Sequence, residues 1–259
     1  MLLAVPLATA AVASAAPTGS GQLQIFTVSN PRPQLVSGGD VLVRVSVPAG
    51  VDPKAVRITA DGRSVRGRFG VQPDGTLLGL VTGLNEGANQ LVARTIGTGA
   101  QSTSLRVVDH PITGPVFSGP QQKPFYCQTQ AFGLAPAVQP DCTAPTQITY
   151  QYFTTGGTFK SLSNPAARPA DMATATVNGR TVPYVVRLER GTIDRAVYEL
   201  AALYDGKEPN PTRPDSTWND KLVYTFGSGC NAGYHQGADT GGVLEDLFLR
   251  QGYAVVPPA

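Results

Sequence analysis

The glycine-rich segment at positions 227–237 holds the residues best suited to chemistry. It reads Gly-Ser-Gly-Cys-Asn-Ala-Gly-Tyr-His-Gln-Gly and follows an apolar run at positions 222–226. Glycines allow backbone N–H groups to point at a bound anion, or at the oxyanion that develops during acyl transfer. We therefore expect a loop that binds an oxyanion or ligand, formed by Gly227, Ser228, Gly229 and Cys230. The rim of its pocket is expected at Tyr234 and His235.

Two other uses of this segment fit its spacing less well. A dinucleotide site needs G-x-G-x-x-G opening directly into a helix. Here Ala232 stands where the third glycine would be, and the next helical pattern starts about ten residues after the first glycines. A phosphate loop needs a Gly-Lys-Ser/Thr ending, which is absent from the segment. An oxyanion loop is the remaining interpretation.

No catalytic residue can be assigned from the sequence. The motif G-x-S-x-G does not occur in the sequence. Ser228 lies between two glycines, but the residue two positions before it is Phe226 and not glycine. α/β-Hydrolases order their triad as serine, acid and histidine along the chain, so His235 comes too early to be the base. A structural loop role for His235 therefore stays open. The second histidine, His110, lies in a Pro/Gly-rich stretch and is expected to be a hydrogen-bonded linker residue.

The cysteines and the N-terminus predict export. Positions 1–15 are rich in Leu, Ala and Val and end in Ala-Ser-Ala, as in a signal peptide. This predicts a secreted protein, extracellular or periplasmic, without a membrane span after signal cleavage. Cys127 and Cys142 are expected to form a disulfide, which contributes about 3 kcal/mol for a loop of this length. Cys230 is left either free or paired with a residue beyond Ala259.

The composition limits the classes of ligand and partner that the chain is expected to bind. Charged residues are only 15% of the chain, the formal net charge is +2, and Lys and Arg form no run. These features argue against nucleic acid as a partner. No Cys or His spacing indicates a metal site, and no motif indicates an organic cofactor.

The elements preceding the glycine-rich segment are read from hydrophobic periodicity. Positions 16–108 show about seven short strands with Asp-Gly turn signals, which predicts an immunoglobulin-like β-sandwich. Positions 109–172 form a Pro/Gly-rich connector that contains the disulfide loop. Positions 174–188 predict a hairpin around an Asn-Gly turn, whereas 192–203 fit strand and helix equally well.

Positions 173–259 predict the first part of an α/β-hydrolase-like domain. The run at 222–226 reads as a strand buried on both faces. A helix is expected over 242–251, with Gly252 following its end, and then a second strand at 253–256 that is parallel to the first. The expected fold class is thus an all-β immunoglobulin-like sandwich followed by an incomplete α/β sheet.

Several stretches resemble known families. Trp-Asn-Asp-Lys-Leu-Val-Tyr at 218–224, leading into the glycine-rich segment, is similar to the tannase and feruloyl-esterase group of α/β-hydrolases. The stretches at 36–40, 110–120, 187–193 and 226–237 resemble a secreted bacterial family of unknown function, domain-of-unknown-function family 6351. The resemblance implies a hydrolase-like fold. It also implies that the nucleophile lies in a Cys-Ser-Gly-Gly-Ser-type elbow well downstream, so that this chain is an N-terminal fragment.

Two functions follow as hypotheses. The first is the N-terminal part of a secreted serine esterase that acts on a small-molecule or polymeric ester and is inactive alone, because it lacks the nucleophile. The second is a non-enzymatic secreted module that binds a polymer or a cell surface.

Overall fold

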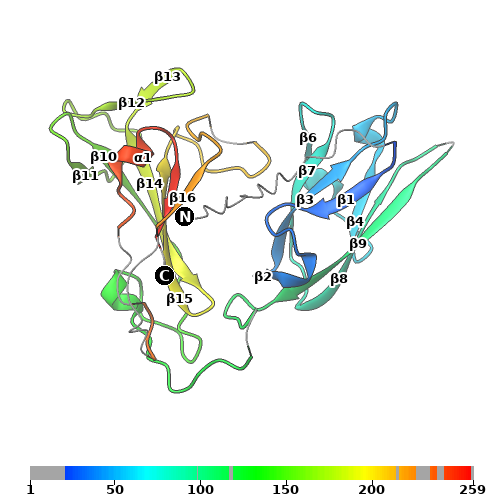
Figure 1. Ribbon diagram of the computed structural model, residues 1–259, viewed down its shortest axis with the longest axis horizontal. Coiled ribbons are helices and arrows are strands. Elements are labelled where there is room, and N and C mark those ends of the chain that lie inside the picture. Colours follow the sequence, from blue (N-terminus) through cyan, green and yellow to red (C-terminus); the bar gives the residue numbers. More distant parts are fainter. Residues whose placement is uncertain are drawn as a thin grey trace, which may run out of the picture.

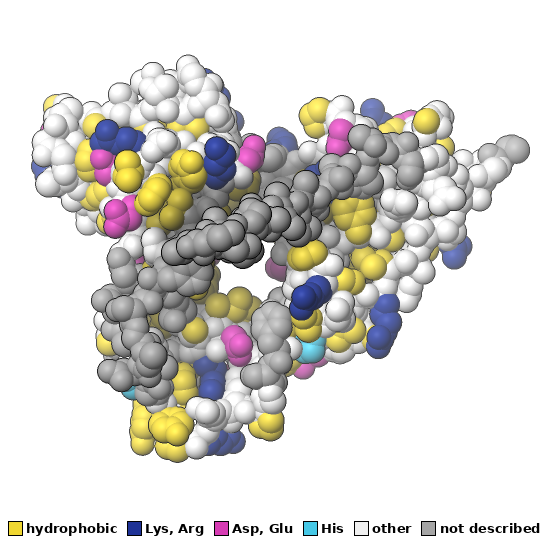
Figure 2. All heavy atoms as spheres, viewed as in Figure 1, with side chains coloured by type: hydrophobic (Ala, Val, Ile, Leu, Met, Phe, Trp, Pro, Cys, Tyr) yellow, Lys and Arg dark blue, Asp and Glu magenta, His cyan; other side chains and the backbone are white. Residues whose placement is uncertain are grey.

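The chain folds into two β-rich bodies joined by a connector. The computed structural model describes residues 21–97, 99–116, 119–213, 216–225, 234–237 and 242–257. Figure 1 shows the first body in blue to green and the second in green to red, with the connector running between them. On the face drawn in Figure 2, acidic and basic side chains lie scattered over both bodies rather than gathering in one block.

The first body contains two sheets. One has the order β1-β3-β7-β6, and the other has the order β2-β9-β8-β4-β5. The strands of the first sheet are β1 (Gln24–Thr27), β3 (Asp40–Ser46), β7 (Leu77–Thr82) and β6 (Phe69–Val71). Those of the second are β2 (Val36–Ser37), β9 (Ser102–His110), β8 (Gly87–Arg94), β4 (Arg57–Ala60) and β5 (Arg63–Ser64). Three single-turn 3-10 helices lie between strands, η1 (Pro33–Leu35), η2 (Pro53–Ala55) and η3 (Arg66–Arg68).

Alternating apolar residues explain why these two sheets pack together. In β3 the side chains of Val41, Val43 and Val45 are almost completely buried, as expected for a strand with one face on the core. They belong to one hydrophobic cluster with Leu91 of β8, so the cluster joins both sheets. The Asp-Gly turn predicted between β4 and β5 is confirmed, with positive φ at Asp61 and the following glycine.

The second body is built on a six-stranded sheet with the order β11-β10-β14-β15-β17-β16. Its strands are β11 (Phe159–Ser161), β10 (Gln147–Phe153), β14 (Val185–Ile193), β15 (Ala196–Leu203), β17 (Ala254–Val256) and β16 (Leu222–Tyr224). All pairs are antiparallel except β16 with β17. A separate hairpin of β12 (Thr174–Val177) and β13 (Arg180–Pro183) confirms the hairpin predicted around the Asn-Gly turn.

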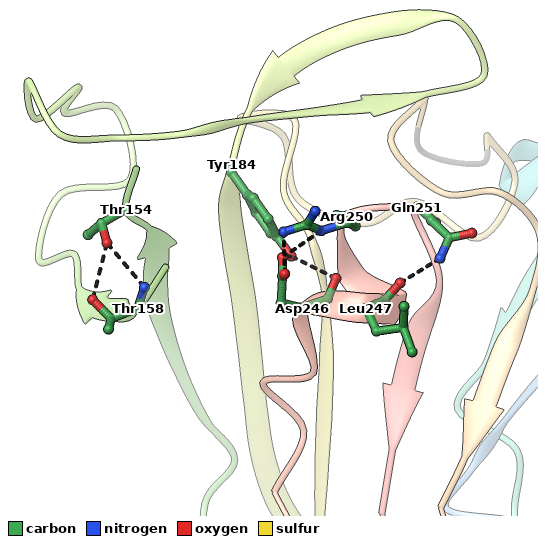
Figure 3. A network of polar contacts seen from close by, with 7 residues as sticks. All are labelled: Thr154, Thr158, Tyr184, Asp246, Leu247, Arg250 and Gln251. Atoms are coloured by element: carbon green, nitrogen blue, oxygen red, sulfur yellow. Dashed lines mark hydrogen bonds and ion pairs between the residues drawn. The ribbon is translucent and has the colours of Figure 1, made fainter. Parts of the chain in front are cut away.

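One face of this sheet packs under the hairpin and a single helical turn, α1 (Asp246–Leu249). Val186, Ala201 and Val255 of the sheet are fully or almost fully buried against Leu249 of α1. Figure 3 shows how Tyr184 ties α1 to the sheet: its hydroxyl donates to Asp246 Oδ1 at 3.0 Å, and Arg250 also pairs with that carboxylate. Burial is the main cause that raises the pKa of the Tyr184 phenol.

The expected α/β-hydrolase-like domain is wrong. In the described residues the second body has one α-helix, of four residues, where a helix over 242–251 was expected. Most of its sheet is antiparallel, and β10 and β11 come from the stretch at 109–172 that was expected to be a connector. The strand at 222–224 is not buried on both faces, since Leu222 is 57% exposed. Two of the fold expectations are confirmed: the first body is β-rich, and β16 pairs in parallel with β17.

Candidate functional site

Residues 234–237 are the part of the glycine-rich segment that the structure describes. The four residues predicted to bind an oxyanion lie outside the described residues, so their role stays a prediction: Gly227, Ser228, Gly229 and Cys230. The two predicted rim residues can be placed. Tyr234 is 55% exposed, whereas His235 is only partly exposed.

Residues 234–237 are held against a distant stretch of backbone. The N–H of Tyr126 donates to the carbonyl of Tyr234 at 2.7 Å, and the N–H of Gln236 donates to the carbonyl of Tyr126 at 2.9 Å. These bonds form an isolated parallel bridge between Tyr126 and His235. The C-terminal part of the glycine-rich segment is therefore fixed by β-type pairing and not by contacts of exposed side chains.

Gln236 is the anchor of this arrangement. Its side chain is completely buried. The amide Nε2 donates to the carbonyl of Cys142 at 2.7 Å, and Oε1 accepts from the N–H of Gln128 at 2.8 Å. Replacing this buried amide is costly, because the carbonyl of the fully buried Cys142 would lose its partner and bear its desolvation penalty. The sequence does not predict this anchor, since nothing in its local pattern marks Gln236 as buried.

The predicted disulfide between Cys127 and Cys142 is confirmed, with an S–S distance of 1.98 Å. It closes the loop whose two ends both bond to Gln236. Inside the loop lies a 3-10 helix, η4 (Thr129–Phe132), whose Thr129 hydroxyl donates to the carbonyl of Ala135 at 2.8 Å. The loop at 127–142, with its disulfide and η4, is thus linked to residues 234–237 through Gln236. We call this cross-linked loop, together with Gln236, the disulfide platform.

The sheet supports the disulfide platform through a buried ion pair. Arg190 of β14 pairs with Glu199 of β15, and the carboxylate-bearing residue is only 3% exposed. Arg190 also donates from Nη1 to the carbonyl of Phe132 at 2.7 Å. The ring of Phe132 lies against Gly237, where a Cβ atom would come within 3.3 Å of it. Platform, sheet and the end of the glycine-rich segment are thus in continuous contact.

The sequence left two roles open for His235, one at the rim of a pocket and one as a structural loop residue. Its Nδ1 is buried and has no hydrogen-bond partner among the described residues. A buried polar atom without a partner is unusual in a folded protein and commonly marks a site of function or an interaction with another group. His110, by contrast, lies at the end of β9 in the first body, where its Nε2 is 3.0 Å from the carbonyl oxygen of Gln34. The expected hydrogen bond of His110 is confirmed, but its expected place in a linker is wrong, because the residue belongs to strand β9.

A second polar cluster lies on the opposite face of the sheet and was not predicted. Arg187, only 8% exposed, has Nη1 at 2.8 Å from Glu189 and Nε at 3.4 Å from Glu208. Tyr198 donates its hydroxyl to Glu189 at 2.9 Å, and Tyr150 donates to Glu208 at 3.0 Å. Burial and the neighbouring Glu208 raise the pKa of Tyr150 to about 12. The alternation of charged and apolar residues along 185–190 was the available signal for this cluster.

The described residues contain no group of three or more His, Cys, Asp or Glu side chains placed to hold a metal ion. None of their helices is long and apolar enough to span a membrane. Among residues 234–237, the groups open to a ligand are the unpartnered imidazole Nδ1 of His235 and the exposed ring of Tyr234.

Comparison with known proteins gives one match. Residues 25–258 match the model of a family described as a tannase-like family of unknown function (DUF6351). No curated protein matches the chain. The matched range includes both bodies and the glycine-rich segment.

Proposed function

The chain belongs to this tannase-like family, and from that membership we propose that it is part of an enzyme that hydrolyses carboxylic esters. The single observation that carries the proposal is the extent of the match, which covers residues 25–258 and hence every element described above except the first residue of β1. The substrate is a small-molecule or polymeric acyl ester. The reaction is nucleophilic acyl transfer by a serine hydroxyl, followed by hydrolysis of the acyl-enzyme.

Within this function we assign the backbone amides at positions 227–230 to the oxyanion, on the basis of their sequence. Oxyanion donors are effective only when they are oriented before the reaction begins. Two described features fix the chain on either side of these positions: β16 pairs in parallel with β17, and Gln236 is hydrogen-bonded to the disulfide platform. His235, with its unpartnered Nδ1, would line the rim of the pocket.

Secretion is part of the same proposal. The Cys127–Cys142 disulfide supports it, because such bonds persist mainly in oxidising compartments. An enzyme outside the cytoplasm meets esters in its surroundings, which accords with a polymeric or small-molecule substrate.

The proposal is tested by ester hydrolysis with the natural protein in its full length. We expect turnover of p-nitrophenyl acetate by the wild type. Gly229→Pro removes one backbone N–H and should lower kcat by about 10²–10³ with little change in KM, as for loss of an oxyanion donor elsewhere. Gly229→Ala keeps the N–H and is the matched control, with kcat expected within about tenfold of wild type.

Two outcomes would contradict the proposal. Absence of turnover for acetyl, butyryl and aromatic acyl esters by the wild type would refute the hydrolase function. Equal losses in Gly229→Pro and Gly229→Ala would leave the hydrolase function standing but refute the role of that amide.

A further inference from the structure

A groove of about 750 Å³ opens on the second body beside the β12–β13 hairpin. One wall is the end of the hairpin around β13, and the other is formed by residues 204–213 together with Ser216. Four cationic residues line it, and all of them are exposed: Arg168, Arg180, Lys207 and Arg213. The groove lies away from residues 234–237, since the lining includes no residue of the disulfide platform.

The residues that line the groove carry a net positive charge. Two acidic residues line it, Asp205 and Glu208. Glu208 already pairs with the buried Arg187 beneath it, and Asp205 Oδ1 accepts the N–H of Lys207 at 2.9 Å. None of the four lining cations forms an ion pair with another residue in the described part of the chain. Their charges are therefore available to an anionic ligand.

Hydrogen bonds within the chain hold residues 210–213 of this wall. Asn210 Oδ1 accepts from the N–H of Thr212 at 2.9 Å and from its hydroxyl at 2.8 Å, and the N–H of Arg213 donates to the carbonyl of Asn210 at 3.0 Å. Gln72 of the first body donates from Nε2 to the carbonyl of Thr212 at 3.2 Å. These bonds limit the conformational entropy that binding would otherwise have to remove.

A second cavity continues from the first. It has a volume of about 570 Å³ and shares Pro209, Asn210 and Arg213 with the groove. Its far wall is formed by the first body and adds another cation, Arg68. The two cavities together form an extended basic track from the β12–β13 hairpin to the first body, which is longer than a single small anion requires.

We propose that this track binds an acidic carbohydrate chain through its carboxylate groups. Arginine guanidinium groups recognise carboxylates with two parallel hydrogen bonds, and three of the four cations in the groove are arginines. The two lining carboxylates, with Thr181 and Asn210, supply acceptors and donors for sugar hydroxyls.

The same lining disfavours nucleic acid. Single strands are bound through exposed aromatic rings on which bases stack. The ring among the groove residues, Tyr204, is instead packed on Tyr150 with centroids 4.9 Å apart. The proposal does not depend on the hydrolase function, because binding is measured without turnover.

The experiment is isothermal titration of the natural protein with tetragalacturonate at low and moderate salt. We expect saturable binding that weakens as salt rises. Maltotetraose, a neutral chain of equal length, should bind at least about tenfold more weakly. Equal affinity for the neutral chain would overturn the proposal, as would tighter binding of an oligothymidylate or full competition by millimolar inorganic sulfate.

Matched variants locate the site. Arg180→Gln combined with Arg213→Gln should weaken tetragalacturonate binding by about tenfold or more. Arg57→Gln combined with Arg106→Gln removes the same charge from exposed positions on the first body and should change the affinity by less than about twofold. Circular dichroism confirms folding of each variant. Equal weakening by both pairs would show attraction by net charge alone and would overturn the proposal.

Discussion

Replacing Gln236 by methionine tests how the glycine-rich segment is fixed. Methionine has a similar length but cannot hydrogen-bond. It therefore leaves the carbonyl of the fully buried Cys142 without a partner, and it removes the acceptor of the N–H of Gln128, which is an exposed residue. Each unpaired buried backbone group costs about 1–3 kcal/mol. Because the side chain is fully buried, water cannot compensate without rearrangement. With one such group left unpaired, the variant should lose about 1–3 kcal/mol of unfolding free energy.

Urea denaturation followed by circular dichroism measures this loss, read from the midpoint at unchanged slope. Gln130→Met is the matched control: it lies in the same loop, is exposed, and should change stability by less than about 0.5 kcal/mol. Hydrogen exchange at the Gln128 amide should also accelerate in Gln236→Met. A Gln236→Met variant as stable as the control would refute the anchoring role of this amide.

Three further predictions concern the stability of the fold. Gly252→Ala should destabilise by more than Gly206→Ala, as seen in thermal unfolding: both have positive φ, but a Cβ at position 252 would lie 2.8 Å from a backbone carbonyl and one at position 206 meets open space. Tyr184→Phe should cost about 0.5–1.5 kcal/mol in urea denaturation by removing the hydroxyl bonded to Asp246, and a neutral result would show that α1 is held by packing alone. Burial raises the pKa of Asp109, so its contribution to stability should fall as pH rises from its unfolded pKa through its folded pKa. Asp109→Asn should lack that fall, and parallel stability profiles of variant and wild type between pH 4 and 7 would contradict the assignment.

Local turn chemistry was predictable from the sequence. The Asn-Gly turn of the β12–β13 hairpin and the Asp-Gly turn of β4–β5 both adopt positive φ, as those residue pairs favour. The predicted glycine after the last helical turn is confirmed by the φ of +82° at Gly252. The disulfide was also predictable, because two cysteines bracket a loop with few other means of holding its shape.

The secondary-structure predictions that failed concern segments whose conformation depends on pairing with residues distant in the sequence. The stretch at 192–203 contains helix-forming Ala, Leu and Glu, yet it belongs largely to β15 because every residue of that strand pairs with β14. Glu199 is buried there only because Arg190 lies opposite it, a partner that no local pattern reveals. The expected helix over 242–251 shrank to one turn, with Leu247 of its apolar stripe 64% exposed.

Only part of the candidate site could be predicted from the sequence. Glycine content identifies positions 227–237 as unusual, but the residue that fixes the segment bonds across 94 positions to Cys142. Glutamine is usually exposed, so its type gave no warning of complete burial at position 236. Such a contact becomes visible only when the fold brings the disulfide loop beneath the segment.

Covalent labelling by a p-nitrophenyl alkylphosphonate tests the central claim most directly, because this reagent mimics the tetrahedral oxyanion of acyl transfer. Intact-mass measurement of the natural protein should show one phosphonyl adduct per chain, and Gly229→Pro should slow its formation by about 10²–10³ while Gly229→Ala does not. Absence of an adduct on the folded wild-type protein, at reagent concentrations that label other serine esterases, would contradict the assignment of ester hydrolysis.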